Sequence, residues 1–188
     1  MLLNDRQILK LANEGMISPF VSEKVRKIND EPVISFGLQS FGYDMRLADE
    51  FAVFHRPLDG EGIVDPKNFN PKLLRQHKGN VCIIPPNCFA LGVSVEWFNM
   101  PRNVTGLILG KSTYARAGIV ANFTPAEAGW CGRVTIEISN TSSLPAKVYA
   151  GEGFCQILFF MGEDPVSSYA DNGGGKYQGQ TGITLPKV

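Results

Sequence analysis

Short apolar segments separated by turn residues constrain the fold of this chain more than any other feature of its sequence. Glycine, proline and asparagine punctuate these segments, as in Pro85-Pro86-Asn87 and Gly151-Glu152-Gly153. Because strands joined by turns produce this pattern, we expect a mainly β fold, a barrel or jelly roll with little helix. The expected strands are Phe51–Phe54, Val81–Ile84, Phe89–Val95, Val104–Leu109, Val134–Ile138, Lys147–Tyr149 and Phe154–Phe160.

One short helix is expected near the start of the chain, over Asp5–Glu14, because the apolar residues there fall on one helical stripe. Asn4 or Asp5 can cap its first turn, and Gly15 can end it. The polar stretch from Asp59 to Lys78 is expected to be a long excursion with at most a short helix.

The end of the chain, from Tyr169 to Thr184, contains Gly173-Gly174-Gly175 and is expected to be too flexible to form part of the core. Two interpretations stay open on these residues alone. The segment is a mobile flap that becomes ordered over a ligand, or it is a frayed end.

Length and composition predict a single domain over residues 1–188, since 44% of the residues are hydrophobic and can fill one core. The formal net charge is zero and the pI is near 6.7, so we expect no general binding to nucleic acid or to a membrane surface. The amino terminus carries Asp5 and Arg6 and no long apolar run. We therefore expect no secretory signal, no membrane span and a cytoplasmic location.

The loop Gly110–Gly118 brings two cations, two hydroxyl groups and flanking glycines together in one short stretch. Such a loop suits a polyphosphate, because backbone N–H groups, hydroxyls and the Lys111 ammonium can all donate to phosphate oxygens. It is not a Walker loop, since Thr105 stands where that motif needs a glycine. The other interpretation is an exposed turn with solvated charges.

The segment Thr124–Asn140 is a turn followed by an alternating strand. With a side-chain period of two, Val134, Ile136 and Ile138 face one side. Glu137 faces the other side, among polar neighbours. A strand with its polar face in water is one interpretation, and a carboxylate in a site is the other.

Five segments together resemble the dCTP deaminases, of the superfamily that also holds the trimeric dUTP diphosphatases. The resemblance covers nearly the whole chain. Two positions depart from the family pattern: Lys111 stands where the family usually has arginine, and Ala128 where it commonly has proline. Lysine keeps the charge but cannot form the two-pronged contact of arginine with phosphate. The segments are Met1–Ile8, Ser40–Leu47, Gly110–Gly118, Thr124–Asn140, and Tyr169 with Lys176–Gly182.

The resemblance implies a distorted β-barrel or jelly roll with a short N-terminal helix and a flexible C-terminal flap at about residues 169–188. It also implies a homotrimer with active sites between subunits, dCTP as substrate and dTTP as a possible inhibitor. Magnesium is expected with the triphosphate rather than on a protein ligand set. Asp44 could lie near that ion or could fix the Tyr43–Leu47 turn.

Zinc, which most nucleobase deaminases use to activate water, lacks its motif here. The motif is His-x-Glu followed by Pro-Cys-x-x-Cys, whereas the two histidines, His55 and His77, are followed by other residues and no cysteine pair has ligand spacing. Glu137 is therefore the candidate general base and acid, with no metal ligand expected. The resemblance adds Ser112 to hold the water or the amino group and Arg116 to orient Glu137 and favour its ionised form.

The remaining substrate contacts follow from the resemblance. Gln156 is notable on its own, because an amide inside an apolar strand needs a hydrogen-bonding partner, which is a ligand, another subunit or a group in the core. The expected substrate-binding residues are Lys111, Ser112, Thr113, Tyr114, Ala115, Arg116, Thr135, Ile136, Glu137, Gln156, Tyr169, Lys176 and Gln180.

Three functions are compatible with this sequence. The first is deamination of dCTP to dUTP and ammonia, which would supply dUTP for dUMP and thymidylate synthesis. The second is a dUTP diphosphatase, or a bifunctional enzyme that continues to dUMP, an option that Glu127 keeps open; Glu137 favours deamination over a pure diphosphatase. The third is a non-enzymatic nucleotide-binding or structural β trimer.

Overall fold

The computed structural model describes residues 1–56, 62–171 and 175–188 and has a mainly β architecture, as the sequence predicts. Gly173 and Gly174 of the expected flap, and the first three residues of the polar excursion, lie outside the described residues. The elements are α1 (Asp5–Asn13), β1 (Ile17–Ser18), β2 (Val25–Ile28), β3 (Glu31–Leu38), β4 (Tyr43–Phe54), the 3₁₀ turn η1 (Pro71–Leu73), β5 (Leu74–Lys78), β6 (Val81–Ile84), β7 (Phe89–Asn99), β8 (Val104–Gly110), α2 (Ser112–Ala115), β9 (Ile119–Asn122), β10 (Cys131–Asn140), β11 (Ala146–Tyr149) and β12 (Gly153–Met161).

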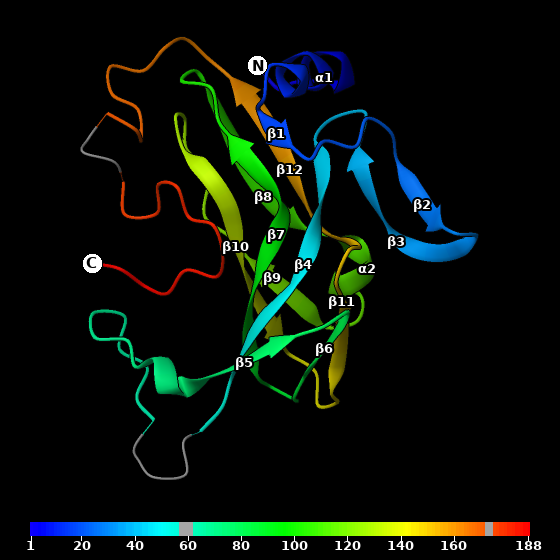
Figure 1. Ribbon diagram of the computed structural model, residues 1–188, viewed down its shortest axis with the longest axis vertical. Helices are drawn as coiled ribbons and strands as arrows, with labels where there is room; N and C mark the ends of the chain where they lie inside the picture. The colour runs from blue at the N-terminus through cyan, green and yellow to red at the C-terminus, as the bar shows by residue number, and fades with distance from the viewer. Residues whose placement is uncertain (57–61, 172–174) are drawn as a thin grey trace.

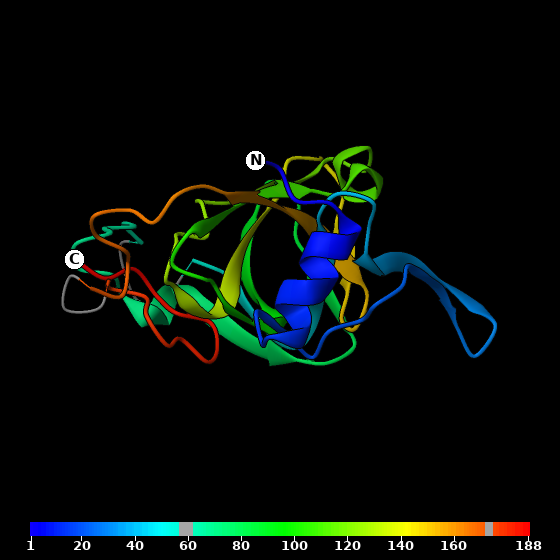
Figure 2. The same ribbon diagram turned by 90° about the horizontal axis from the view of Figure 1, so that it is seen from above.

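Antiparallel pairing joins most of the strands into one branched sheet. Its main path runs β2-β3-β4-β7-β10-β9, and β12 links β4 to β8. The strands curl around a common interior, with α1 on one side and the C-terminal segment at the opposite end (Figures 1 and 2). β11 and β6 form a separate pair.

The core is filled from alternating strand positions, which is why the sequence pattern predicts it. Val134, Ile136 and Ile138 of β10 are buried together with large side chains of neighbouring strands, such as Phe98 and Phe159. At the start of the chain Asn4 caps α1 with a capping box, and Gly15 follows the helix with φ of +98°. No helix among the described residues is long and apolar enough to cross a membrane.

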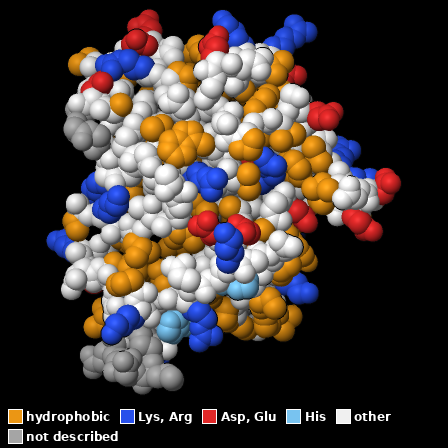
Figure 3. Space-filling model, in the orientation of Figure 1, with side chains coloured by type: hydrophobic (Ala, Val, Ile, Leu, Met, Phe, Trp, Pro, Cys, Tyr) orange, Lys and Arg blue, Asp and Glu red, His pale blue; other side chains and the backbone are white. Residues whose placement is uncertain are grey.

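Two features were not predicted from the sequence. β2 and β3 form a hairpin that projects from the barrel (Figures 1, 2 and 3). Asn29 and Asp30 at its tip both have positive φ, which a tight hairpin turn of this kind requires. Within the expected excursion, Leu74–Lys78 forms a strand, β5, that pairs with β4.

The C-terminal segment contributes to the packing, so the expectation that it is no part of the core is wrong for Tyr169 and Ile183. Ile183 and Leu185 pack against a buried cluster of Ala52, Leu74 and Leu91. Tyr169 packs against the main core. Ile183 and Leu185, which were not predicted to pack, lie close to the carboxyl end, after the glycines.

Candidate active site

Glu137 lies on the half-buried polar face of β10, opposite Leu91 of β7 and Asn122 of β9. Burial raises the pKa of its carboxyl group to about 7, and a backbone hydrogen bond only partly offsets this effect. The polar face of this strand is therefore not an ordinary solvated surface. At neutral pH the carboxyl group exists in both protonation states.

A cavity of about 750 Å³ opens beside Glu137. Its apolar walls include Phe89, Leu91 and Ile108, and its polar groups include Thr135 and Glu127. Concave, largely apolar sites with a few polar groups are the usual form of small-molecule sites. The cavity thus joins the predicted base to a space that can hold a ligand.

Residues of the C-terminal segment close one side of this cavity. Tyr169, Lys176 and Gln180, each predicted to bind substrate, line the cavity together with Glu137 and Thr135. Segments that are far apart in the chain therefore line the same cavity.

Hydrogen bonds to β10 hold the segment in this position. The backbone N–H of Arg133 donates to Gln180 O at 2.9 Å, and Gln180 Nε2 donates to Arg133 O at 2.5 Å. Trp130 Nε1 donates to the carbonyl of Tyr177 at 3.0 Å. Trp130 and Tyr177 also line the cavity and were not among the predicted site residues. The tryptophan that follows the turn before β10 was the available signal for the first of them.

The turn that contains Ala128 is closed by a backbone hydrogen bond. The backbone N–H of Trp130 donates to Glu127 O at 3.1 Å, and Gly129 adopts φ of +80°. A side chain at Gly129 would also collide with Ser168. Glycine is thus required here both by the backbone conformation and by the close approach of Ser168.

The predicted phosphate loop occupies a different part of the subunit. Ser112, Thr113, Ala115 and Arg116 are exposed on and beside α2. None of residues 111–116 belongs to the described lining of the Glu137 cavity, and no ion pair between described side chains joins Arg116 to Glu137. Within one subunit, the structure does not bring the predicted serine and arginine to the glutamate.

Lys111 turns inward rather than toward solvent. Its ammonium forms an ion pair with Asp44 and donates to Ser35 Oγ at 3.3 Å. This contact ties the start of α2 to β3 and β4. Asp44 therefore balances the charge of Lys111 and does not lie free on the surface.

Two predicted contact residues, Tyr114 and Ile136, have buried side chains. The hydroxyl of Tyr114 accepts a hydrogen bond from the backbone of Tyr149 at 3.2 Å. A substrate contact from either residue would have to use its backbone groups. Gln156 is half-buried on β12, where it lies opposite Leu109 of β8. It does not belong to the described lining of the Glu137 cavity.

The histidines make local contacts. His77 Nε2 lies 2.9 Å from the carbonyl of Val81, and His55 Nδ1 lies 3.3 Å from that of Arg56. In the described parts of the chain, no group of three His, Cys, Asp or Glu side chains is placed to hold a metal ion.

Comparison with known proteins gives a consistent result. Residues 2–162 match the family described as dCTP deaminase-like. A dCTP deaminase of Herpetosiphon aurantiacus is 54% identical over 185 residues, covering 98% of this chain and 97% of the relative. A dCTP deaminase of Azotobacter vinelandii is 55% identical over 187 residues, covering 98% of each chain.

The fold is also found among solved structures. The crystal structure of 2'-deoxycytidine 5'-triphosphate deaminase from Agrobacterium tumefaciens superimposes with a TM-score of 0.62 at 17% sequence identity, over 86% of this chain and 48% of that chain. At this identity the likeness establishes the shared fold. The family match over residues 2–162 and the relative that is 54% identical over 98% of the chain show that this chain belongs to the dCTP deaminase-like family.

Proposed function

We propose that this protein hydrolyses dCTP to dUTP and ammonia, with Glu137 as general base and acid. The observation that carries the proposal is the half-buried Glu137 carboxyl group beside a cavity that Tyr169, Lys176 and Gln180 also line. Relatives more than half identical over nearly the whole chain are named dCTP deaminase, which supports the same reaction.

The reaction needs one group that moves two protons. Water adds through its oxygen to carbon 4 of cytosine while Glu137 takes one water proton, which it then gives to ring nitrogen 3. The remaining hydroxyl proton passes through Glu137 to the amino group. The carbon–nitrogen bond breaks, ammonia leaves and the carbonyl of uracil forms. A pKa near 7 suits both roles, because the carboxyl group can accept and donate protons at neutral pH.

In this scheme the protein's own groups polarise the water, so the reaction is zinc-independent. Magnesium enters as part of the substrate, bound to the triphosphate. Lys176 and Gln180, at the wall of the cavity, are suited to phosphate oxygens. dTTP shares the triphosphate and deoxyribose of the substrate, and we propose it as an inhibitor. The product dUTP would supply dUMP for thymidylate synthesis in the cytoplasm.

A homotrimer would complete the site. The proposal places Ser112 and Arg116 of one subunit beside Glu137 of the next, which accounts for their exposure on α2 and their separation from the cavity within one chain. Arg116 would then orient Glu137 and favour its ionised form.

An apolar strip on β8 and β12 supports this assembly. Leu107 and Leu109 are exposed on β8, where they pair with Leu158 and Gln156 of β12. Residues opposite one another in a sheet share a face, so the amide of Gln156 lies among apolar side chains. Burial of the strip against another subunit would remove these side chains from water and supply a partner for the amide.

A bifunctional enzyme that converts dCTP to dUMP is the second candidate. Glu127 lines the same cavity as Glu137. A second carboxylate there could activate water for attack on phosphorus, as a diphosphatase requires.

Two parallel incubations test these functions. The purified protein is mixed with magnesium and either dCTP or dUTP, and ammonia and pyrophosphate are measured in each. Ammonia without pyrophosphate is expected. Pyrophosphate in equal amount to ammonia would support the bifunctional enzyme, pyrophosphate from dUTP without ammonia from dCTP would support a pure diphosphatase, and no product would leave a non-enzymatic binding protein.

A further inference from the structure

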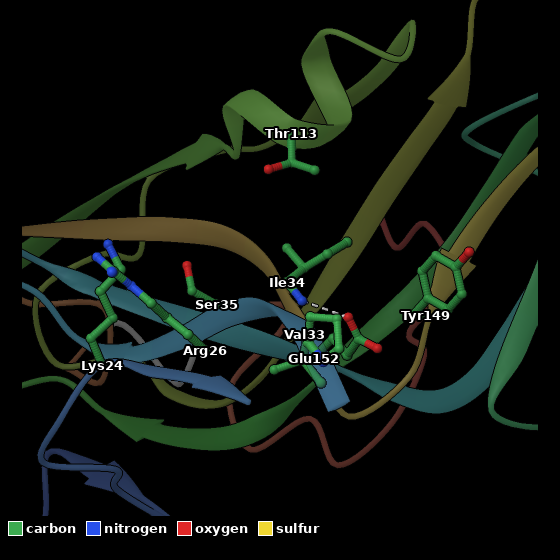
Figure 4. Close-up of a pocket in the computed structure, with 9 residues that line it drawn as sticks. Lys24, Arg26, Val33, Ile34, Ser35, Thr113, Tyr149 and Glu152 are labelled. Carbon is green, nitrogen blue, oxygen red and sulfur yellow. Dashed lines mark hydrogen bonds between the residues drawn. The ribbon is translucent and has the colours of Figure 1, made fainter. Parts of the chain in front are cut away.

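A second cavity, of about 640 Å³, lies between the projecting β2–β3 hairpin and α2. Figure 4 shows Lys24, Arg26 and Ser35 at one end and Tyr149 and Glu152 at the other, with Thr113 above the opening. The hairpin thus supplies most of one wall. The lining residues are Lys24, Arg26, Pro32, Val33, Ile34, Ser35, Thr113, Tyr149 and Glu152.

The cationic end of this cavity carries positive charge that no described acidic side chain neutralises. The side chains of Lys24 and Arg26 form no hydrogen bond or ion pair with residues in the ranges 1–56, 62–171 and 175–188. The acid at the other end is already engaged, because Glu152 Oε2 accepts from the backbone N–H of Ile34 at 2.7 Å. Figure 4 draws this bond away from the two cations. An anion would therefore bind at the end held by Lys24 and Arg26.

Two hydroxyl groups complete the cationic end. Ser35 Oγ accepts a hydrogen bond from the Lys111 ammonium at 3.3 Å, which leaves its own O–H free to donate to a ligand. Thr113 is exposed and offers a second hydroxyl. Two cations with two hydroxyl donors form a set that matches the several oxygens of a polyphosphate.

Thr113 connects this cavity to the substrate loop. It lines the hairpin cavity and it also belongs to the stretch Lys111–Arg116 that the family resemblance assigns to substrate. A triphosphate held at Ser112 and Thr113 would therefore have its far end directed to the hairpin. Lys27 directly follows Arg26 in β2. Because successive side chains of a strand alternate, Lys27 points to the opposite face from Arg26.

We propose that Lys24 and Arg26 bind the terminal phosphates of the nucleotide whose triphosphate meets Ser112 and Thr113. This inference rests on the proposed function for the identity of the nucleotide. The hairpin then contributes to substrate binding, and Lys24 and Arg26 distinguish nucleotides by their number of phosphates. The polyphosphate chemistry could also come from a separate nucleotide, a possibility that the kinetic arm of the test distinguishes.

The binding arm of the test uses calorimetry with tripolyphosphate and with dCTP and dCDP, on the full-length protein. Lys24→Gln and Arg26→Gln are each expected to lower the affinity for tripolyphosphate and for dCTP about five- to tenfold. Each should also reduce the preference for dCTP over dCDP. Lys27→Gln removes one charge from the same strand on its other face and should leave all three affinities within about twofold. Equal affinities in all four proteins would overturn the proposal. Because tripolyphosphate has no base to deaminate, its affinity is independent of whether dCTP is a substrate.

The kinetic arm follows ammonia release. Tripolyphosphate should inhibit competitively against dCTP, and Arg26→Gln should raise KM about five- to tenfold with kcat nearly unchanged. Non-competitive inhibition that Arg26→Gln abolishes would overturn the shared site and place a separate polyphosphate at the hairpin. Circular dichroism confirms folding, and Arg26→Lys, which keeps the charge, should restore most of the affinity.

Discussion

The ammonium of Lys111 is paired with the carboxylate of Asp44 in the interior of the protein, where the two side chains are 12% and 5% exposed. Lys111 is one of the two positions at which the sequence is expected to depart from the usual family pattern. Its side chain fixes the start of α2 to β4. The loop that is predicted to meet phosphate is thus held from behind, and Ser112, Thr113 and Arg116 are left exposed.

Replacement of Asp44 by asparagine should lower the free energy of unfolding by about 3 kcal/mol, because it leaves a buried ammonium without its counter-charge. Urea denaturation measures this change. Asp49→Asn is the matched control, since Asp49 pairs with Lys78 at the surface, at 3.7 Å, and should cost no more than about 1 kcal/mol. Equal losses in the two variants would show that the buried pair does not fix the loop.

The pH dependence of kcat/KM tests whether Arg116 of a neighbouring subunit reaches Glu137. Within one subunit, burial raises the pKa of Glu137 to about 7 against the lowering effect of a backbone hydrogen bond. A guanidinium beside the carboxylate favours the ionised form, so the acidic limb of the parental enzyme should lie below pH 7. Arg116→Gln should move this limb upward, toward pH 7. An unchanged limb in the variant would contradict the proposed contact.

Gln180 is expected to have two effects that can be separated. Gln180→Ala removes the hydrogen bond from its side chain to Arg133 O, so the C-terminal segment should be cleaved faster by protease even without nucleotide. It should also weaken dCTP by about tenfold. Gln76→Ala, the same change on the exposed face of β5, should alter neither. Faster cleavage without loss of affinity would show that Gln180 is a tether and not a phosphate ligand.

Metal removal addresses the zinc-independent scheme. After extended treatment with a strong chelator, addition of magnesium alone should restore full deamination. Recovery that requires zinc would contradict the zinc-independent scheme.

The β fold and the position of Glu137 follow directly from the sequence, because the alternation of Val134, Ile136 and Ile138 fixes which face of β10 is buried. The β2–β3 hairpin could not be predicted in this way, since β2 and the first residues of β3 project from the barrel and are mostly exposed. The packing of Ile183 and Leu185 was not predicted, because the glycines before them indicated a flexible segment. The distance between Ser112 and Glu137 depends on how subunits assemble, which no local pattern encodes.

The central claim is that Glu137 moves the protons of the reaction, and its replacement by glutamine tests this claim most directly. Glutamine keeps the size and shape of the side chain and one acceptor oxygen but cannot take a proton from water. Ammonia release from saturating dCTP should fall by ~100- to 10,000-fold, while the dissociation constant for dCTP, measured by calorimetry, should change only a few-fold. Turnover by Glu137→Gln within a few-fold of the parental rate would contradict the account.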